Sequence, residues 1–122
     1  MSLNRLLRDY ASPLTVYVHR QCIFEGDLDS YIYQLSFIYF TSIKDTVLIY
    51  QACFPMSMMS ACVKWAKEHV DQFNTLLRRQ LSSVDSESET YKACMETALA
   101  HADMLSEAGL DFRNMIGRRE EE

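Results

Sequence analysis

Glycine and proline are almost absent from this chain, and their scarcity is the feature that most restricts its fold. The 122 residues include three glycines and two prolines, and residues 27–54 contain neither. A β-rich domain makes a turn about every 8–12 residues and usually places Gly, Pro, Asn or Asp there. The long uninterrupted run therefore predicts an all-α fold. The length fits one globular domain, for which about 100–150 residues is usual.

Residues 28–54 are predicted to form one long helix. The aromatic cluster at residues 37–40 raises the local strand propensity, so a strand is the competing interpretation. Length decides against it, because strands usually have about 5–6 residues, whereas this run would make a helix of about 40 Å. Since apolar side chains cover nearly every direction around residues 35–40, we expect the middle of this helix to lie centrally in a bundle. The apolar positions with heptad-like spacing are Leu28, Ile32, Leu35, Tyr39, Ile49 and Cys53.

A second long helix is expected after Pro55, which ends the first. It begins at Pro55 or Ser57 and runs to about Leu81. Charged residues lie mostly away from its apolar stripe, which is the pattern of an amphipathic helix. The stripe comprises Met59, Cys62, Trp65, Ala66, His69, Phe73, Leu76, Leu77 and Gln80.

The C-terminal third predicts a polar loop, a third long helix and a short helical turn. Residues 82–90 are rich in Ser and acidic side chains, which suits a solvated loop that leads into a helix N-terminus. Gly109 supplies a left-handed stop after that helix, and Leu110 supplies the apolar contact that often follows. The short turn occupies residues 112–116 and ends at Gly117. The helix itself follows Tyr91, Cys94, Met95, Ala98, Ala102 and Leu105.

The two ends of the chain are expected to differ from this bundle. Residues 1–22 carry apolar side chains at roughly helical spacing, but Pro13 interrupts them and predicts a kinked or broken helix near residues 11–12. Residues 118–122 form a charged tail. The predicted organisation is an N-terminal helical segment at 1–22, an elongated bundle at 23–117 and the tail at 118–122.

Charge and cysteine content exclude several classes of protein. The net charge is −5, with its largest acidic excess after residue 81, and this argues against a nucleic-acid partner. The chain opens without an apolar targeting run, so we expect its four cysteines to be reduced thiols in the cytoplasm. The longest uncharged stretch, residues 30–43, is shorter than the roughly 20 residues that span a bilayer.

Two Cys/His pairs are the sharpest chemical candidates. Cys62 and His69 are seven residues apart, as are Cys94 and His101, and antiparallel helices would bring Cys62 opposite His101 and His69 opposite Cys94. Seven residues correspond to about 10 Å of helix rise, so one zinc ion cannot bind both ligands of a helix. We therefore interpret these side chains as parts of a bundle seam, with a metal- or ligand-binding bundle as an alternative. No nucleophile–base motif is present, and we assign no catalytic, cofactor or metal residue.

Two groups of side chains are candidates for an interaction surface. Tyr31, Tyr33 and Phe37 exceed what one core seam needs, which suggests a second surface buried against a neighbouring module. Arg78 and Arg79 could contact an acidic protein or lipid surface, although cations on a helix are usually a solvated face. The second alternative function is therefore a membrane-contacting helical adaptor.

Several segments in the same order resemble the C-terminal helical domain of the exocyst's eighty-four-kilodalton subunit, called component eight in animals. The segments are residues 24–28 (FEGDL), 38–41 (IYFT), 65–69 (WAKEH) and 108–112 (AGLDF). Fungal members are especially similar at residues 50–55 (YQACFP) and 59–65 (MSACVKW). The resemblance covers about residues 22–116 and is weakest before residue 21, where Pro13 lies.

The resemblance implies a non-catalytic scaffold built as a cullin-repeat-like helical rod. Its expected role is the tethering of secretory vesicles to the plasma membrane during exocytosis, with other exocyst subunits as partners. It implies contact with the vesicle and the plasma membrane only indirectly, and neither nucleic acid nor a small-molecule substrate. The expected location is the cytoplasm, with recruitment to sites of exocytosis. No cofactor follows from the family's motifs.

Overall fold

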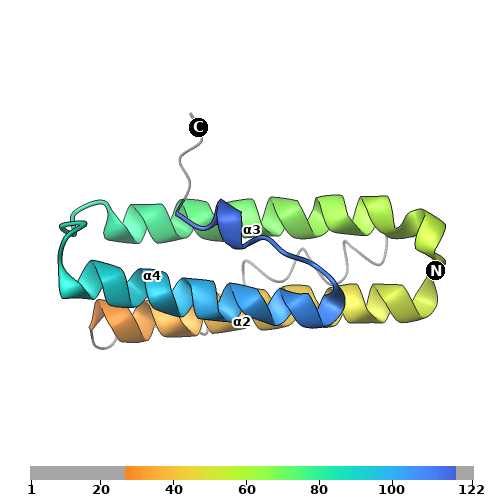
Figure 1. Cartoon of the computed structure of the whole chain (residues 1–122), viewed down its shortest axis with the longest axis horizontal. Helices are drawn as coiled ribbons and strands as arrows, with labels where there is room; N and C mark the ends of the chain where they lie inside the picture. The colour runs from red at the N-terminus through yellow and green to blue at the C-terminus, as the bar shows by residue number, and fades with distance from the viewer. Residues whose placement is uncertain (1–26, 118–122) are drawn as a thin grey trace.

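The computed structural model describes residues 27–117, which form three long helices with short 3₁₀ segments and no strand. Each long helix runs antiparallel to the one before it, and together they form an elongated bundle (Figure 1). This arrangement confirms the predicted all-α class. The predictions for residues 1–22 and 118–122 fall outside the described residues. The elements are α2 (Leu28–Cys53), η1 (Met56–Met58), α3 (Met59–Leu81), α4 (Glu89–Ala102), η2 (Asp103–Ala108) and η3 (Arg113–Met115).

Helix α2 begins and ends where its sequence provides the capping groups. The Asp27 carboxylate accepts a hydrogen bond from the Ser30 amide at 2.9 Å, which satisfies a free donor of the first turn. At the other end the Phe54 amide donates to the Tyr50 carbonyl at 2.9 Å. Pro55 follows in extended conformation, so the helix cannot continue.

Helix α3 begins at Met59, after the 3₁₀ turn η1, instead of at Pro55 or Ser57, and it ends at Leu81 as predicted. The last turn of α3 contains Arg78 and Arg79. Positive charge there interacts favourably with the negative end of the helix dipole. Ser88 caps α4 by accepting from the Tyr91 amide at 3.2 Å. The sequence predicted helix through Leu105, whereas the structure changes to 3₁₀ geometry at Asp103, a tightening common in the last turns of helices.

Gly109 ends this helical rod with a Schellman motif. Its φ is 77°, in the left-handed region that glycine adopts without steric cost. The Gly109 amide donates to the Ser106 carbonyl and the Leu110 amide donates to the Leu105 carbonyl, each at 3.0 Å. The predicted stop at Gly109 is confirmed, and Leu110 is buried as expected.

Helix α2 is the centre of the bundle and packs against both other helices. Tyr39 and Phe40 of α2 contact Phe73 of α3, with ring centroids 5.7 and 4.9 Å apart. Tyr39, Phe40 and Phe73 are almost fully buried. Burial of large aromatic side chains contributes much of the hydrophobic stabilisation of such a core.

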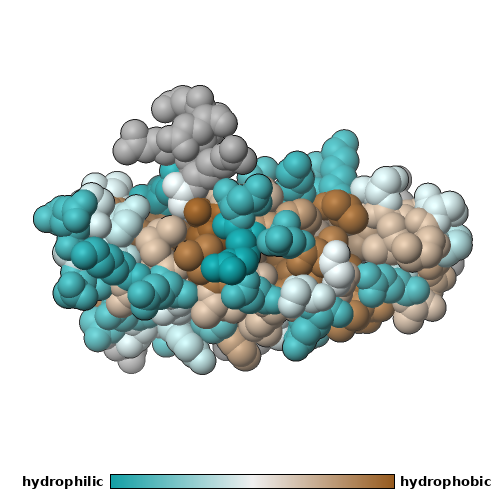
Figure 2. Space-filling view, in the orientation of Figure 1, coloured by the Kyte–Doolittle hydropathy of each residue, from teal (hydrophilic) through white to brown (hydrophobic). Residues whose placement is uncertain are grey.

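The segment after Gly109 closes the bundle by crossing from the end of η2 back to α3 (Figure 1). Phe112, Met115 and Ile116 are buried along it. Its far end is fixed by the Gly117 amide, which donates to Oδ1 of Asn74 at 2.6 Å. Figure 2 shows polar residues at the left end of this face, by the α3–α4 loop, and apolar residues at the surface towards its middle and right.

Candidate interaction surface

An aromatic pair lies at the surface where α2 meets α4. Tyr33 and Phe37 are 55% and 44% exposed, and their rings are nearly parallel with centroids 6.3 Å apart. His101 of α4 presents its ring edge-on to both, with centroids 4.7 and 5.7 Å away. Because T-shaped contacts of this kind are favourable, the histidine supports two aromatic rings that remain largely exposed.

His101 is fixed in turn by Ser36, a buried polar residue of α2. Nδ1 of His101 lies 2.5 Å from the Ser36 hydroxyl oxygen, and that hydroxyl also donates to the Tyr33 carbonyl at 3.2 Å. The Ser36 hydroxyl thus lies between the Tyr33 carbonyl and the His101 ring, and the direction of the Ser36–His101 hydrogen bond follows the tautomer of the ring. Burial lowers the pKa of His101 and so favours the neutral ring at neutral pH.

A groove of about 450 Å³ lies beside Tyr33, between the first halves of α2 and α4. Alanine and threonine on the α4 side keep it open. The thiol of Cys94, next to Ala93 in the chain, donates to a carboxylate oxygen of Asp29 at 3.3 Å, which ties the two helices together. The groove is lined by Asp29, Ser30, Tyr33, Gln34, Ala93 and Thr97.

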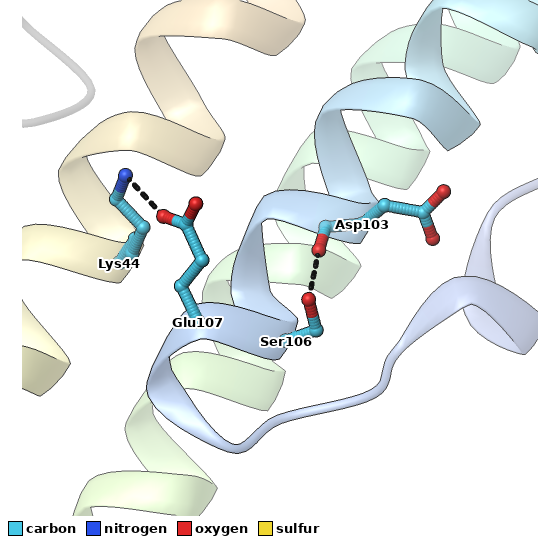
Figure 3. A network of polar contacts seen from close by, with 4 residues as sticks. All are labelled: Lys44, Asp103, Ser106 and Glu107. Carbon is cyan, nitrogen blue, oxygen red and sulfur yellow. Dashed lines mark hydrogen bonds and ion pairs between the residues drawn. The ribbon is translucent and has the colours of Figure 1, made fainter.

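Polar contacts fix the second half of the same seam. The Lys44 ammonium donates across the seam to a carboxylate oxygen of Glu107 at 2.8 Å, as Figure 3 shows. The Ser106 hydroxyl donates to the Asp103 carbonyl within η2. The Glu107 side chain raises the pKa of Lys44 through the hydrogen bond. Two turns further along α2, the Gln51 amide donates to the Ala108 carbonyl at 2.8 Å.

The structure separates the five residues predicted for an interaction surface. Tyr33 and Phe37 lie together, whereas Tyr31 is half-buried against the core. Arg78 and Arg79 are in the last turn of a different helix, α3. Arg79 is exposed, while Arg78 is half-buried and lines a cavity of about 280 Å³ beneath the α3–α4 loop.

Two residues of this surface were missed at the sequence level. Leu48 is 39% exposed and lies eleven residues after Phe37, a spacing that returns to nearly the same side of a helix. The eleven-residue spacing could have placed Leu48 on the same side of the helix as Phe37. The signal was hidden because most residues of this helix are apolar. His101 was considered as a metal ligand, whereas its role in the structure is to support Tyr33 and Phe37.

The Cys/His pairs do not meet as antiparallel α3 and α4 would allow, because α4 packs mainly on α2. His101 lies against α2, and Cys94 contacts Asp29 of that helix. Nδ1 of His69 lies 2.9 Å from the Trp65 carbonyl within α3. Between residues 27 and 117, no three His, Cys, Asp or Glu side chains are grouped so that they could hold a metal ion.

Burial also determines the chemistry of the two inward-facing thiols. It raises the pKa of Cys62 to about 11 and, together with the Asp29 carboxylate, that of Cys94 to about 12. A thiol with such a pKa carries almost no thiolate at neutral pH, and thiolate is the nucleophilic form. These cysteines act as small buried side chains of the core.

None of the helices described here is long and apolar enough to cross a membrane.

Comparison with known proteins gives a consistent match over most of the chain. Residues 12–113 match the family described as exocyst component 84 C-terminal. The chain is 59% identical to exocyst complex component exo84 of Neurospora crassa and 57% identical to its counterpart in Gibberella zeae, each over 81% of this chain. It is 29% identical to exocyst complex component 8 of Gallus gallus over 80% of its length.

The aligned region is a small part of these relatives. It spans 14% of the Neurospora crassa protein, 15% of the Gibberella zeae protein and 14% of the Gallus gallus protein. The family match begins at residue 12 and so includes Pro13, ahead of the region where the resemblance was strongest. No solved structure gives a significant match.

Proposed function

Because the chain belongs to the exocyst component 84 C-terminal family, we propose that it is a structural interaction module within an exocyst subunit. Its partners are other exocyst subunits, and its role is to help hold together a complex that tethers secretory vesicles to the plasma membrane. The module works in the cytoplasm and is recruited to sites of exocytosis with the rest of the complex. Contact with the vesicle and the plasma membrane is indirect.

The observation that carries this proposal is the exposed aromatic pair on a rigid support. Tyr33 and Phe37 project from the central helix, and His101 packs against both rings. Aromatic side chains are enriched where proteins bind one another, because they bury large areas and lose little conformational freedom. Tyr33 and Phe37 therefore form the proposed protein-binding surface, with Tyr31 as a half-buried neighbour. Arg78 and Arg79 are a separate proposed contact for an acidic protein surface.

A non-catalytic role is supported by the state of the reactive side chains. Of the three free thiols between residues 27 and 117, Cys62 and Cys94 are buried and have raised pKa values, while Cys53 is exposed. His101 is occupied by Ser36 and the aromatic pair. A nucleophilic mechanism needs a low-pKa thiol or an activated hydroxyl beside a free base. We therefore propose that the module has no enzymatic activity and requires no cofactor.

Affinity purification of the full-length subunit tests the proposal. The tagged protein is recovered from fungal cells, and the other exocyst subunits are quantified by mass spectrometry. The proposal expects stoichiometric recovery of the complex, and a form that lacks residues 27–117 is expected to lose part of it. Failure of the intact subunit to recover any other exocyst subunit would refute the proposed function.

A further inference from the structure

We infer that the surface formed by α2 and α4 binds an amphipathic helix from another subunit, and that lysine or arginine residues flank the apolar stripe of that helix. The inference rests on the proposed function and adds the chemistry of the partner. It follows from three features of the described residues: an apolar stripe on α2, a groove beside it and an excess of acidic side chains around both.

The apolar stripe consists of Tyr33, Phe37 and Leu48. At about 100° per residue, spacings of four and eleven residues place these side chains within an arc of about 60° on α2. The stripe is about 22 Å long, given about 1.5 Å of rise per residue. All three side chains are more than one-third exposed. Lys44, which is paired with Glu107, lies in the same arc between Phe37 and Leu48, so the stripe has two apolar ends. The distance between these ends matches the side of one helix of about four turns.

The groove beside the stripe supplies room for the backbone of such a helix. Ala93 and Thr97 form its α4 side, and Tyr33 forms its opposite side. Small side chains allow helices to approach closely, whereas the aromatic ring gives an anchor on one side. The remaining lining residues, Asp29, Ser30 and Gln34 on the α2 side, are polar and face the flank of such a helix. A helix that lies in a groove through side chains three or four residues apart is a recurring mode of recognition.

The charge around this face selects the partner. Together α2, α4 and η2 carry six acidic side chains and two basic ones. Glu107 is paired with Lys44 and Asp103 with Arg113 of η3, which leaves Asp29, Asp45, Glu89 and Glu96 outside these pairs, against the basic Lys92. The exposed Asp45 lies on α2 beside the stripe, and the exposed Glu96 lies on α4. Helix α3 has the opposite balance, with four basic side chains and two acidic ones.

Electrostatic complementarity therefore favours a helix with basic flanks on this face. Like charges placed opposite each other across an interface are unfavourable, so an acidic helix would be rejected. The same acidic excess disfavours the anionic cytoplasmic leaflet of a membrane, which attracts basic segments. A second copy of this chain could place the basic side of its α3 against the surface formed by α2 and α4. Crosslinking distinguishes such a copy from a helix of another subunit.

Site-specific photocrosslinking in the assembled complex tests the inference. Benzoylphenylalanine replaces Phe37 or Leu48 in the full-length subunit, and the matched control carries it at the exposed Gln72 on α3. After irradiation of the purified complex, the crosslinked peptides are identified by mass spectrometry. We expect positions 37 and 48 to crosslink to one amphipathic helical segment of another subunit that has basic flanks, and position 72 to give a different product or none.

Three results would overturn the inference. They are crosslinks from positions 37 and 48 to another copy of this chain, crosslinks to lipid, and a complex that assembles without any crosslink at either position. In each case the subunit still recovers its partners, so its place in the complex stands while the inference fails. Crosslinks to lipid, or none, would also show that the aromatic pair is not the protein-binding surface. If the unmodified subunit recovers no exocyst subunit at all, the proposed function fails first.

Charge reversal provides an independent readout. Asp45→Lys with Glu96→Lys is expected to reduce recovery of the crosslinked subunit at least fivefold at low salt. Asp71→Lys, an exposed acid on α3, is the matched control and should leave recovery unchanged. Equal recovery of the partner by the double reversal and by the control would show that the partner's flanks are not basic.

Discussion

Two glycines adopt backbone conformations that other residues reach only with strain. Gly109 and Gly117 have φ values of 77° and 79°. A side chain at position 109 would meet no atom within 4 Å, whereas a Cβ at position 117 would lie 2.7 Å from Cε of Met95. Substitution of Gly109 therefore measures the cost of the backbone conformation alone. Substitution of Gly117 adds the cost of a contact with the flexible Met95 side chain.

We expect Gly109→Ala to lower the free energy of unfolding by about 1–2 kcal/mol, because a left-handed residue with a Cβ costs about that much. Gly117→Ala should lose the same amount and slightly more, since Met95 must move. Urea denaturation followed by circular dichroism measures both. Gly109→Asn is the control and should lose less, because asparagine tolerates this region. Full stability of Gly109→Ala would contradict the assigned backbone geometry.

Burial of His101 makes the folded protein less stable at acidic pH. Its pKa in the folded protein lies below the ordinary value of 6.5, so the unfolded chain binds the proton more readily. The contribution of His101 to the free energy of unfolding is therefore constant above about pH 6.5, and it is lost as the pH falls below that value. We expect urea denaturation between about pH 8 and pH 5 to show a shallower loss for His101→Asn than for the unmodified chain. Parallel curves would contradict the burial of a neutral imidazole.

At the scale of one element, Ser88 fixes the start of α4. Its hydroxyl oxygen accepts from the Tyr91 amide, and its own proton goes to the Asp85 carbonyl at 2.6 Å. Ser88→Ala should therefore cost about 1 kcal/mol, the usual value for loss of a helix N-cap. Ser86→Ala, at an exposed position in the same loop, is the matched control and should change little. Thermal denaturation of the two variants gives the comparison, and equal melting temperatures would rule out the capping role.

The ends of the elements were predictable from the sequence because they depend on local chemistry. Asp27, Pro55 and Gly109 act through their own backbone and side-chain properties, and each lies at a helix boundary in the structure. The change to 3₁₀ geometry at Asp103 has no equally clear local signal. Residue type alone was thus sufficient for the order of helices and nearly sufficient for their bounds.

The packing partner of α4 was not predictable in the same way. This helix buries Cys94, Ala98 and Ala102, small side chains that suit either neighbour. Only the structure shows that α4 lies against α2, where Cys94 contacts Asp29 and His101 contacts Ser36. The heptad spacing did place Tyr39 in the core and Phe37 outside it, as the structure has them. It did not separate the exposed Tyr33 from Tyr31, which is half-buried against the core.

At the scale of the whole molecule, stability depends on the aromatic contact between α2 and α3. Phe73 is fully buried against Tyr39 and Phe40. Phe73→Ala should reduce the free energy of unfolding by about 3–5 kcal/mol, because it removes buried area and leaves a cavity. Leu48→Ala removes a partly exposed side chain and should change it by about 0.5 kcal/mol or less. Urea denaturation of both variants compares the aromatic contact between α2 and α3 with the exposed side of α2.

The central claim is that this bundle holds its complex together through the aromatic pair on α2. The most direct measurement is quantitative recovery of the other exocyst subunits with full-length protein that carries Tyr33→Ala and Phe37→Ala, next to a Gln72→Ala control. Circular dichroism of the 122-residue chain with the same substitutions verifies that the helices are retained. We predict reduced recovery of at least one subunit with the double variant and normal recovery with the control. Normal recovery with both, from correctly folded protein, would contradict the claim.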